Sequence, residues 1–169
     1  MNDLSKYFAI KDQMHTGDLL QWRSSSVIGW LIRWKTDAEV NHSGLVLRMP
    51  EYEGEQKRRW TSEALEHGVY PILLSRRLAC FDGSVWWHQL KPEFDSMRRI
   101  VGVKMAEMWG VGYDFGSLFK QIVAKVSTDT KAFFCSEYCY YCMGGEGTAP
   151  NPGEITKVGF WREEGVQIL

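Results

Sequence analysis

The order of strand-like and helix-like segments constrains the fold of this chain more than any other feature of its sequence. Short apolar stretches bounded by turn residues dominate the first half and are typical of strands. They span residues 16–22, 42–49, 58–66, 68–74 and 84–90. Longer stretches with apolar residues at helical spacing dominate the second half. A run of strands followed by a run of helices favours the α+β class.

Four stretches have the apolar spacing of helices. Residues 24–36, between the first two predicted strands, begin with serines that can cap a helix. Residues 92–109 begin with Pro92, which suits a first helical turn, and Gly110 follows as a stop signal. Residues 114–126 and 135–143 are predicted as the last two helices. The tail after them is predicted as loop, with a short final strand.

The length and charge of the chain limit its organisation and its partners. The 169 residues suit one domain, 1–169, with a sizeable core. The net charge of −1 gives no electrostatic footprint for nucleic acid. Basic residues occur as short pairs that we interpret as solvated: Arg58–Arg59, Arg76–Arg77 and Arg98–Arg99.

No stretch approaches the ~18 consecutive apolar residues that predict a membrane span. The first 14 residues lack the apolar run and cleavage site of a signal peptide. We therefore expect a cytoplasmic protein with no membrane span, unless a phage or a secretion system delivers it elsewhere. The oligomeric state is left open.

Three of the four cysteines, Cys135, Cys139 and Cys142, fall within eight residues in "FFCSEYCYYC". The spacing C-x-x-x-C-x-x-C is that of a cluster-binding loop in radical S-adenosylmethionine enzymes. Iron–sulfur ligands need a loop that wraps the cluster, whereas this stretch has the pattern of a helix. A zinc site needs about four ligands, and the usual paired C-x-x-C arrangement is missing. We therefore expect neither metal nor cofactor here.

On a helix the three cysteines lie along one face. Buried cysteines that form no disulfide usually act as small apolar residues, which suits Cys139 and Cys142. Cys135 differs because it stands at the predicted helix start, where unpaired N–H groups and the helix dipole favour a thiolate. Glu137 is predicted as a first-turn carboxylate that complements the same dipole. From these residues alone, Cys135 is equally well read as a third core cysteine.

A nucleophilic cysteine needs a base, usually histidine, and a group that orients the imidazole. Of the four histidines, His15 and His67 adjoin turns and His88 lies in a predicted strand. His42 begins a strand, where a histidine is well held and can face a cleft. Glu63 lies on the expected partner strand, and a hairpin between the two strands would bring it beside His42.

Five short motifs occur in an order that resembles a known family: "GDLLQW", "NHSGLVL", "TSEALEHGV", "GYDFGSLF" and "FFCSEY". The set resembles circularly permuted NlpC-type cysteine hydrolases, of the YiiX-like group, and more distantly lecithin:retinol acyltransferase. The resemblance spans residues 16–143. It implies a papain-like fold whose sheet comes first and whose nucleophile helix comes last.

The resemblance also implies roles for individual residues. Cys135 matches the nucleophile, His42 the general base and Glu63 the group that orients His42. Tyr113 matches an aromatic residue that lines the site or holds the oxyanion. We interpret its neighbour Asp114 as a helix N-cap.

The expected function is therefore a cysteine hydrolase, or thiol protease, acting through a Cys-His-Glu triad and an acyl-enzyme thioester. The bond cleaved would be an amide in a peptide such as a cell-wall peptide, an ester or a thioester. The alternatives are a lipid or amine acyltransferase on the same site and an inactive binding module. The expected partners are a peptide, a peptidoglycan fragment or an acyl lipid. The apolar face of residues 24–35, a segment that carries Trp30 and Trp34, is expected to pack on the sheet rather than to accept an acyl chain.

Overall fold

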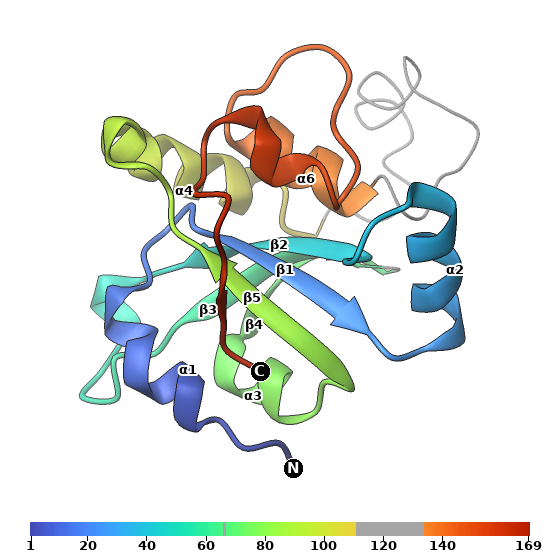
Figure 1. Ribbon diagram of the computed structural model, residues 1–169. Coiled ribbons are helices and arrows are strands. Elements are labelled where there is room, and N and C mark those ends of the chain that lie inside the picture. Colours follow the sequence, from blue (N-terminus) through green and yellow to red (C-terminus); the bar gives the residue numbers. More distant parts are fainter. Residues whose placement is uncertain (66, 111–133) are drawn as a thin grey trace.

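The computed structural model describes residues 1–65, 67–110 and 134–169, and these residues build one mixed sheet-and-helix structure (Figure 1). Within them, six antiparallel strands form one sheet in the order β4-β3-β2-β1-β5-β6. The strands are β1 Leu19–Ser24, β2 His42–Leu47, β3 Trp60–Leu65, β4 Gly68–Leu73, β5 Gly83–His88 and β6 Val166–Gln167. The first four strands follow each other as a meander, and β5 then pairs with the free side of β1.

The helices lie on both sides of this sheet. They are α1 Ser5–Ile10, α2 Val27–Thr36, α3 Leu74–Ala79, α4 Arg98–Glu107 and α6 Phe134–Cys142, with 3₁₀ turns at η1 Lys11–Gln13, η2 Pro50–Tyr52, η3 Pro92–Met97 and η4 Ile155–Val158. Figure 1 shows α4 and α6 above the sheet, α1 and α3 below it, and α2 at the end where β2 begins. No helix among the described residues is both long and apolar enough to cross a membrane.

Alternation along the strands gives the sheet two apolar faces and the molecule two core clusters. In β1, Leu19 belongs to the cluster under α4 and α6, whereas Leu20 and Trp22 belong to the cluster toward α1 and α3. Helix α6 contributes to the first cluster a set of buried side chains: Tyr138, Cys139 and Cys142. The sheet therefore has a helix layer packed on each face, and α6 lies directly on β2 and β3.

The predicted strands and the helix 135–143 are confirmed, and β2 pairs with β3 as expected. The helix predicted over 92–109 is only half correct, because its first six residues form the 3₁₀ helix η3. The predicted helix 114–126 lies outside the described residues. The short helices α1 and α3, six residues each, were not predicted because so few residues give no clear periodicity.

The expected packing of the apolar face of residues 24–35 on the sheet does not extend to its two tryptophans. Ser26 caps the helix by accepting a hydrogen bond from the Gly29 N–H at 3.1 Å, as its sequence suggests. Trp30 and Trp34, however, are 55% and 73% exposed, and their rings stack with centroids 6.5 Å apart. The two rings cover each other rather than the sheet.

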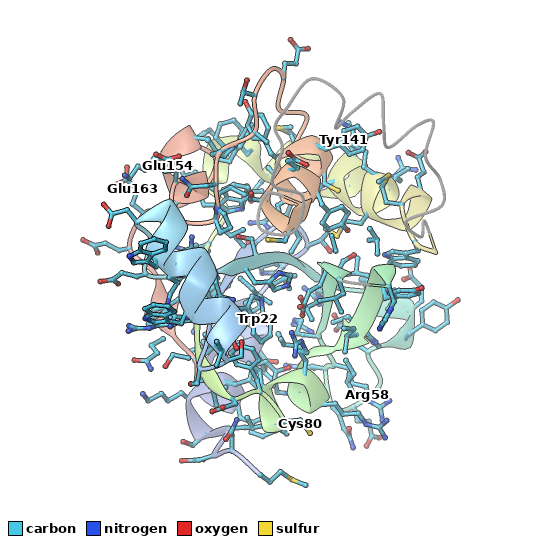
Figure 2. The ribbon with its side chains drawn as sticks, turned by 90° about the vertical axis from the view of Figure 1, so that its right-hand side faces the viewer. Trp22, Arg58, Cys80, Tyr141, Glu154 and Glu163 are labelled. Carbon is cyan, nitrogen blue, oxygen red and sulfur yellow. The ribbon has the colours of Figure 1, made fainter. Side chains whose placement is uncertain are left out.

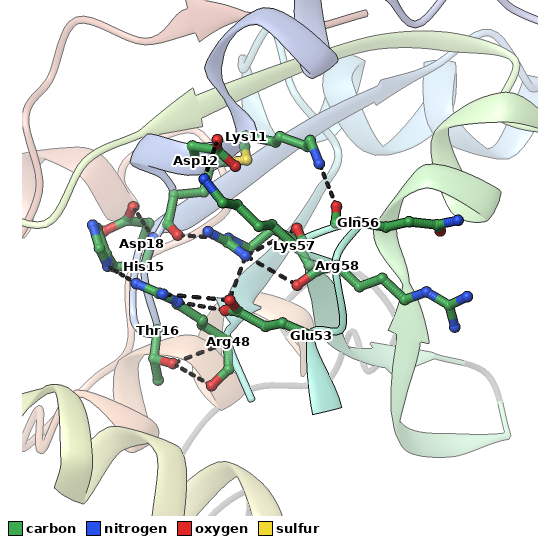
Figure 3. A network of polar contacts seen from close by, with 12 residues as sticks. Lys11, Asp12, His15, Thr16, Asp18, Arg48, Glu53, Gln56, Lys57 and Arg58 are labelled. Carbon is green, nitrogen blue, oxygen red and sulfur yellow. Dashed lines mark hydrogen bonds and ion pairs between the residues drawn. The ribbon is translucent and has the colours of Figure 1, made fainter. Parts of the chain in front are cut away.

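A network of charged side chains ties together the loops that precede β1, follow β2 and precede β3 (Figure 3). Glu53 accepts from Arg48 and, at 3.0 Å, from Arg59, whose side chain is only 1% exposed. Asp18, fully buried, accepts from the Trp87 indole at 2.9 Å and from Arg98 at 2.8 Å. These contacts satisfy the buried carboxylates with arginines and fixed N–H groups.

Candidate active site

His42 is the first residue of β2 and is held at the end of the sheet by its neighbours. It pairs with Trp22 of β1, and the N–H of Asn41 donates to the Trp22 carbonyl at 3.0 Å. The Asn41 side-chain oxygen accepts from the Ser24 N–H at 2.8 Å. The side chain of His42 is 16% exposed. It is thus well held at the start of a strand, as the sequence suggested, and largely buried.

Glu63 reaches His42 from the adjacent strand β3. The distance between Glu63 Oε2 and His42 Nε2 is 2.8 Å, and Glu63 is fully buried. The register pairs Leu45 with Ser62, which sets Glu63 beside Gly44 and two residues along β2 from His42. The two predicted site residues on the sheet are therefore brought together by the hairpin that the sequence indicated.

Gly44 leaves the space through which Glu63 reaches the histidine. A Cβ at Gly44 would lie 2.8 Å from Glu63 Cγ and 3.0 Å from Thr61 Oγ1. Such contacts are too close for any other residue type to fit without a shift. Gly44, the glycine of "NHSG", thus leaves the room that the Glu63 side chain needs to reach His42.

Cys135 comes to His42 from the opposite layer. It is the second residue of α6, which packs on β2 and β3, and it is 2% exposed. Burial alone would lower the pKa of His42, but its charge interaction and hydrogen bond with Cys135, together with Glu63, raise that pKa to about 10. The structure therefore places the imidazole of His42 in contact with both a thiol and a carboxylate. In this arrangement the imidazole can accept a proton from sulfur.

Arg77 of α3 is the residue at this site that sequence reasoning missed. The prediction that the pair Arg76–Arg77 is solvated holds for Arg76, which is exposed, and is wrong for Arg77, which is partly buried. The Arg77 Nη2 donates to Glu63 Oε2 at 3.2 Å, and its Nε lies 3.3 Å from Oε1. Burial would raise the pKa of Glu63, but His42 and then Arg77 hold it below its usual value. No sequence signal marks Arg77, because α3 brings it to Glu63 only through tertiary packing.

Cys139 and Cys142 belong to the apolar core, as predicted for them. Both are buried in the cluster under α4 and α6. Burial raises the pKa of Cys139 well above its usual value and that of Cys142 to about 12, so both are neutral thiols. Tyr138, on the same helix, hydrogen-bonds Ser62 of β3 at 2.5 Å and fixes α6 on the sheet.

The segment after α6 folds back over the start of that helix. Ser136 Oγ donates to the Pro150 carbonyl at 2.7 Å, and Gln21 of β1 donates to the Pro152 carbonyl at 2.7 Å. Between this segment and residues 37–40, which lead into β2, lies a hollow of about 440 Å³. Glu137 lies in the first turn of α6 as predicted, and burial raises its pKa.

Tyr113 and Asp114 lie outside the described residues. His15 adjoins a turn as predicted and is half-buried, with its Nδ1 3.4 Å from Arg48 Nη1. His88 is buried, with its Nδ1 3.0 Å from the Arg162 carbonyl oxygen. Exposed Cys80 lies at the outer end of α3, away from Tyr141 on α6 (Figure 2).

Across residues 1–65, 67–110 and 134–169, no group of three or more His, Cys, Asp or Glu side chains is arranged to hold a metal ion.

Comparison with known proteins identifies the fold. No family model and no curated protein matches the sequence. The structure is similar to the crystal structure of the metalloprotein YiiX from Escherichia coli O157:H7, DUF1105, with a TM-score of 0.56 and 19% identity. The match covers 77% of this chain and 64% of that one, so the chain spans a little under two thirds of the length of YiiX. The chain therefore has a YiiX-like α+β fold.

Proposed function

We propose that this protein is a cysteine hydrolase that cleaves an amide, ester or thioester bond through Cys135, His42 and Glu63. The observation that carries the proposal is the contact of His42 with two partners at once, Cys135 on one side and Glu63, at 2.8 Å, on the other. A histidine held between a thiol and a buried carboxylate is the arrangement that nucleophilic cysteines require.

The fold that goes with this proposal is the circularly permuted NlpC-type papain-like fold. Its support is the order of the elements: the sheet with His42 and Glu63 comes first, and the helix with Cys135 comes after it. The five motifs that resemble the permuted family follow the same order. The proposed triad thus joins two parts of the chain far apart in sequence.

In the proposed acylation step, the Cys135 thiolate attacks the substrate carbonyl carbon while His42 is an imidazolium. A carbon–sulfur bond forms, and the carbonyl electron pair moves onto oxygen. The oxyanion would be stabilised at the N-terminal end of α6, where Cys135 stands and where the helix dipole favours negative charge. The intermediate then breaks its bond to the leaving group, which takes the proton of His42.

In the deacylation step, water attacks the thioester and His42 accepts a proton from it. The carbon–sulfur bond breaks, the acid product leaves and the thiolate–imidazolium pair is restored. Glu63 is not consumed in either step, because its role is to hold and orient the imidazole. Peptidoglycan peptides, other peptides and acyl lipids are the substrate classes proposed for this chemistry.

The proposal is tested by alkylation with iodoacetamide at neutral pH in a Cys80→Ser background, which removes the exposed thiol. We expect Cys135 to be labelled well before Cys139 and Cys142, both neutral core thiols. Mass spectrometry of the digest locates the label. A Cys135 that reacts no faster than these two would overturn the proposal and favour a binding module.

Turnover is then screened on peptidoglycan peptides, acyl lipids and acyl thioesters, with and without an added amine. Cys135→Ala is expected to remove all turnover while its thermal unfolding stays close to that of the parent. Product analysis separates hydrolysis from transfer to the amine. Turnover that persists in Cys135→Ala would contradict the proposed nucleophile.

A further inference from the structure

We propose that Arg77 is a positioning residue that shares the negative charge of Glu63 and thereby keeps His42 able to both release and accept a proton. The inference rests on the proposed function and adds a fourth residue to its site. It concerns the step in which the imidazole changes charge. That step needs a histidine that is not held permanently in its protonated form.

The contacts place Arg77 and His42 on the same carboxylate. Glu63 Oε2 lies 2.8 Å from His42 Nε2 and 3.2 Å from Arg77 Nη2. The Arg77 Nε is 3.3 Å from Oε1 and 3.4 Å from Oε2. Glu63 is fully buried, so its charge is divided between these two cations rather than spread into water.

The guanidinium of Arg77 is itself held in place by aromatic rings. It lies 4.9 Å from the centre of the Trp22 ring and 5.2 Å from that of Phe81. Trp22 is the residue paired with His42 across β1 and β2, and the two rings are 6.5 Å apart. One tryptophan therefore contacts both cations that share Glu63. These ring contacts hold the Arg77 guanidinium beside the carboxylate more firmly than a solvent-exposed arginine would be held.

The charges around Glu63 balance in each state of the proposed cycle. Before attack, the Cys135 thiolate faces the imidazolium and Glu63 faces Arg77. After acylation the sulfur is a neutral thioester, and a neutral His42 is needed to accept a proton from water. Glu63 would then be a buried anion without a cation if Arg77 were absent, which is costly.

Without Arg77, Glu63 would hold His42 as an imidazolium in the acyl-enzyme and slow the release of the acyl group. Among the described residues, the ionisable groups around His42 and Glu63 come from two further elements. They are Cys135 and Cys139 of α6 and Arg77 of α3. Cys139 stays neutral because burial raises its pKa. Arg77 is thus the one permanent cation in this described set.

The test measures the protonation of His42 by NMR in two forms that lack the thiolate. One form is the protein alkylated at Cys135 by iodoacetamide, which imitates the neutral sulfur of the acyl-enzyme, and the other is Cys135→Ala. Each form is prepared with Arg77 unchanged and with Arg77→Gln, Arg77→Met and Arg77→Lys. The matched control is Arg76→Gln, which changes the exposed neighbour.

Arg77→Gln removes the charge but keeps a donor for Glu63, and Arg77→Met fills the space between the rings without charge. We expect the midpoint of His42 protonation to rise by about one pH unit in both, as for the loss of a nearby cation. Arg77→Lys, which keeps the charge, is expected to recover most of the difference. Arg76→Gln is expected to leave the midpoint unchanged.

A midpoint that is unchanged or lowered in both neutral variants would overturn the inference. If Arg77 only held Glu63 in place, its loss would let Glu63 move away from His42 and lower the midpoint, or would leave the midpoint unchanged. Preferential alkylation of Cys135 in the parent is read from the same samples. If that labelling is present and the midpoint does not rise, Arg77 has no such role although the proposed nucleophile stands. If the labelling is absent, the proposed function fails first.

Discussion

Two groups of buried charges in this protein look alike in composition but differ in what they can do. Just beyond the end of β2, Glu53 is held by Arg48 and by buried Arg59 (Figure 3). Beside the start of β2, Glu63 is held by Arg77 and by His42. Arginine stays protonated at any physiological pH, whereas histidine does not.

The difference lies in the second partner of each carboxylate. Arg59 also donates to the Met14 carbonyl at 2.9 Å and to the Lys57 carbonyl at 3.0 Å, so its charge closes loops. His42 instead contacts the thiol of Cys135. A buried carboxylate shared by two arginines is a structural tie, and one shared by an arginine and a thiol-contacting histidine can support proton transfer. The predictions below separate the two groups by stability and by chemistry.

The largest effect is expected in the structural group. Arg59→Met leaves Glu53 with one cation and removes the donor from three loop carbonyls, so the free energy of unfolding should fall by about 3 kcal/mol. Arg58→Met, at the exposed neighbouring position, is the control and should change it little. Denaturant unfolding measures both. The alkylation rate of Cys135 should be the same in each folded protein, and a changed rate would mean that the two groups are coupled.

A smaller effect is expected from Gly44→Ala, which forces Glu63 away from its place. The added Cβ would lie 2.8 Å from Glu63 Cγ, and overpacking of this kind costs about 1–3 kcal/mol. Displacing Glu63 should also lower turnover on any substrate found for the protein. The fall should be at least proportional to the fraction of molecules in which Glu63 has lost its contact with His42. Gly102→Ala in α4 is the matched control, since its Cβ would meet Thr16 at an ordinary 3.4 Å. Equal activity in both variants would show that the space at Gly44 is not needed.

The smallest effect is expected from Glu63→Gln, and it appears in the pH dependence. The pKa of His42 lies at about 10, above the ordinary 6.5, so the imidazolium that protonates the leaving group is present below that pH and lost as pH rises through it. Glu63 contributes to this rise, and its neutral replacement should move the alkaline limb of activity down by about one unit. A limb that stays in place would remove Glu63 from the control of His42.

The parts of the site that lie close in sequence were predictable. His42 and Glu63 sit on strands 42–49 and 58–66 whose alternating apolar residues predict adjacent pairing, and the register then brings the side chains together. The helix start at Cys135 was predictable too, although only the resemblance to the permuted family assigned Cys135 the role of nucleophile. These signals are local, and local patterns of strand and helix are what a single sequence carries best.

What the sequence could not predict depends on packing between distant elements. Arg77 reaches Glu63 because the six-residue helix α3 turns back under the sheet, and nothing in "SRRLA" distinguishes it from solvated Arg76. The exposed stacking of Trp30 on Trp34 was missed for the same reason: apolar spacing predicts which residues share a helix face, not whether another element covers it. Tyr113 stays a prediction, as do the domain 1–169 and the cytoplasmic location.

The central claim is that Cys135 and His42 form a coupled pair supported by Glu63, and NMR titration of His42 tests it most directly. In the wild-type protein the account predicts an imidazolium that persists to about pH 10, and a midpoint that falls by more than one unit in Cys135→Ala because the interaction of His42 with Cys135 is gone. A histidine that titrates near its ordinary 6.5 in both proteins would contradict the account.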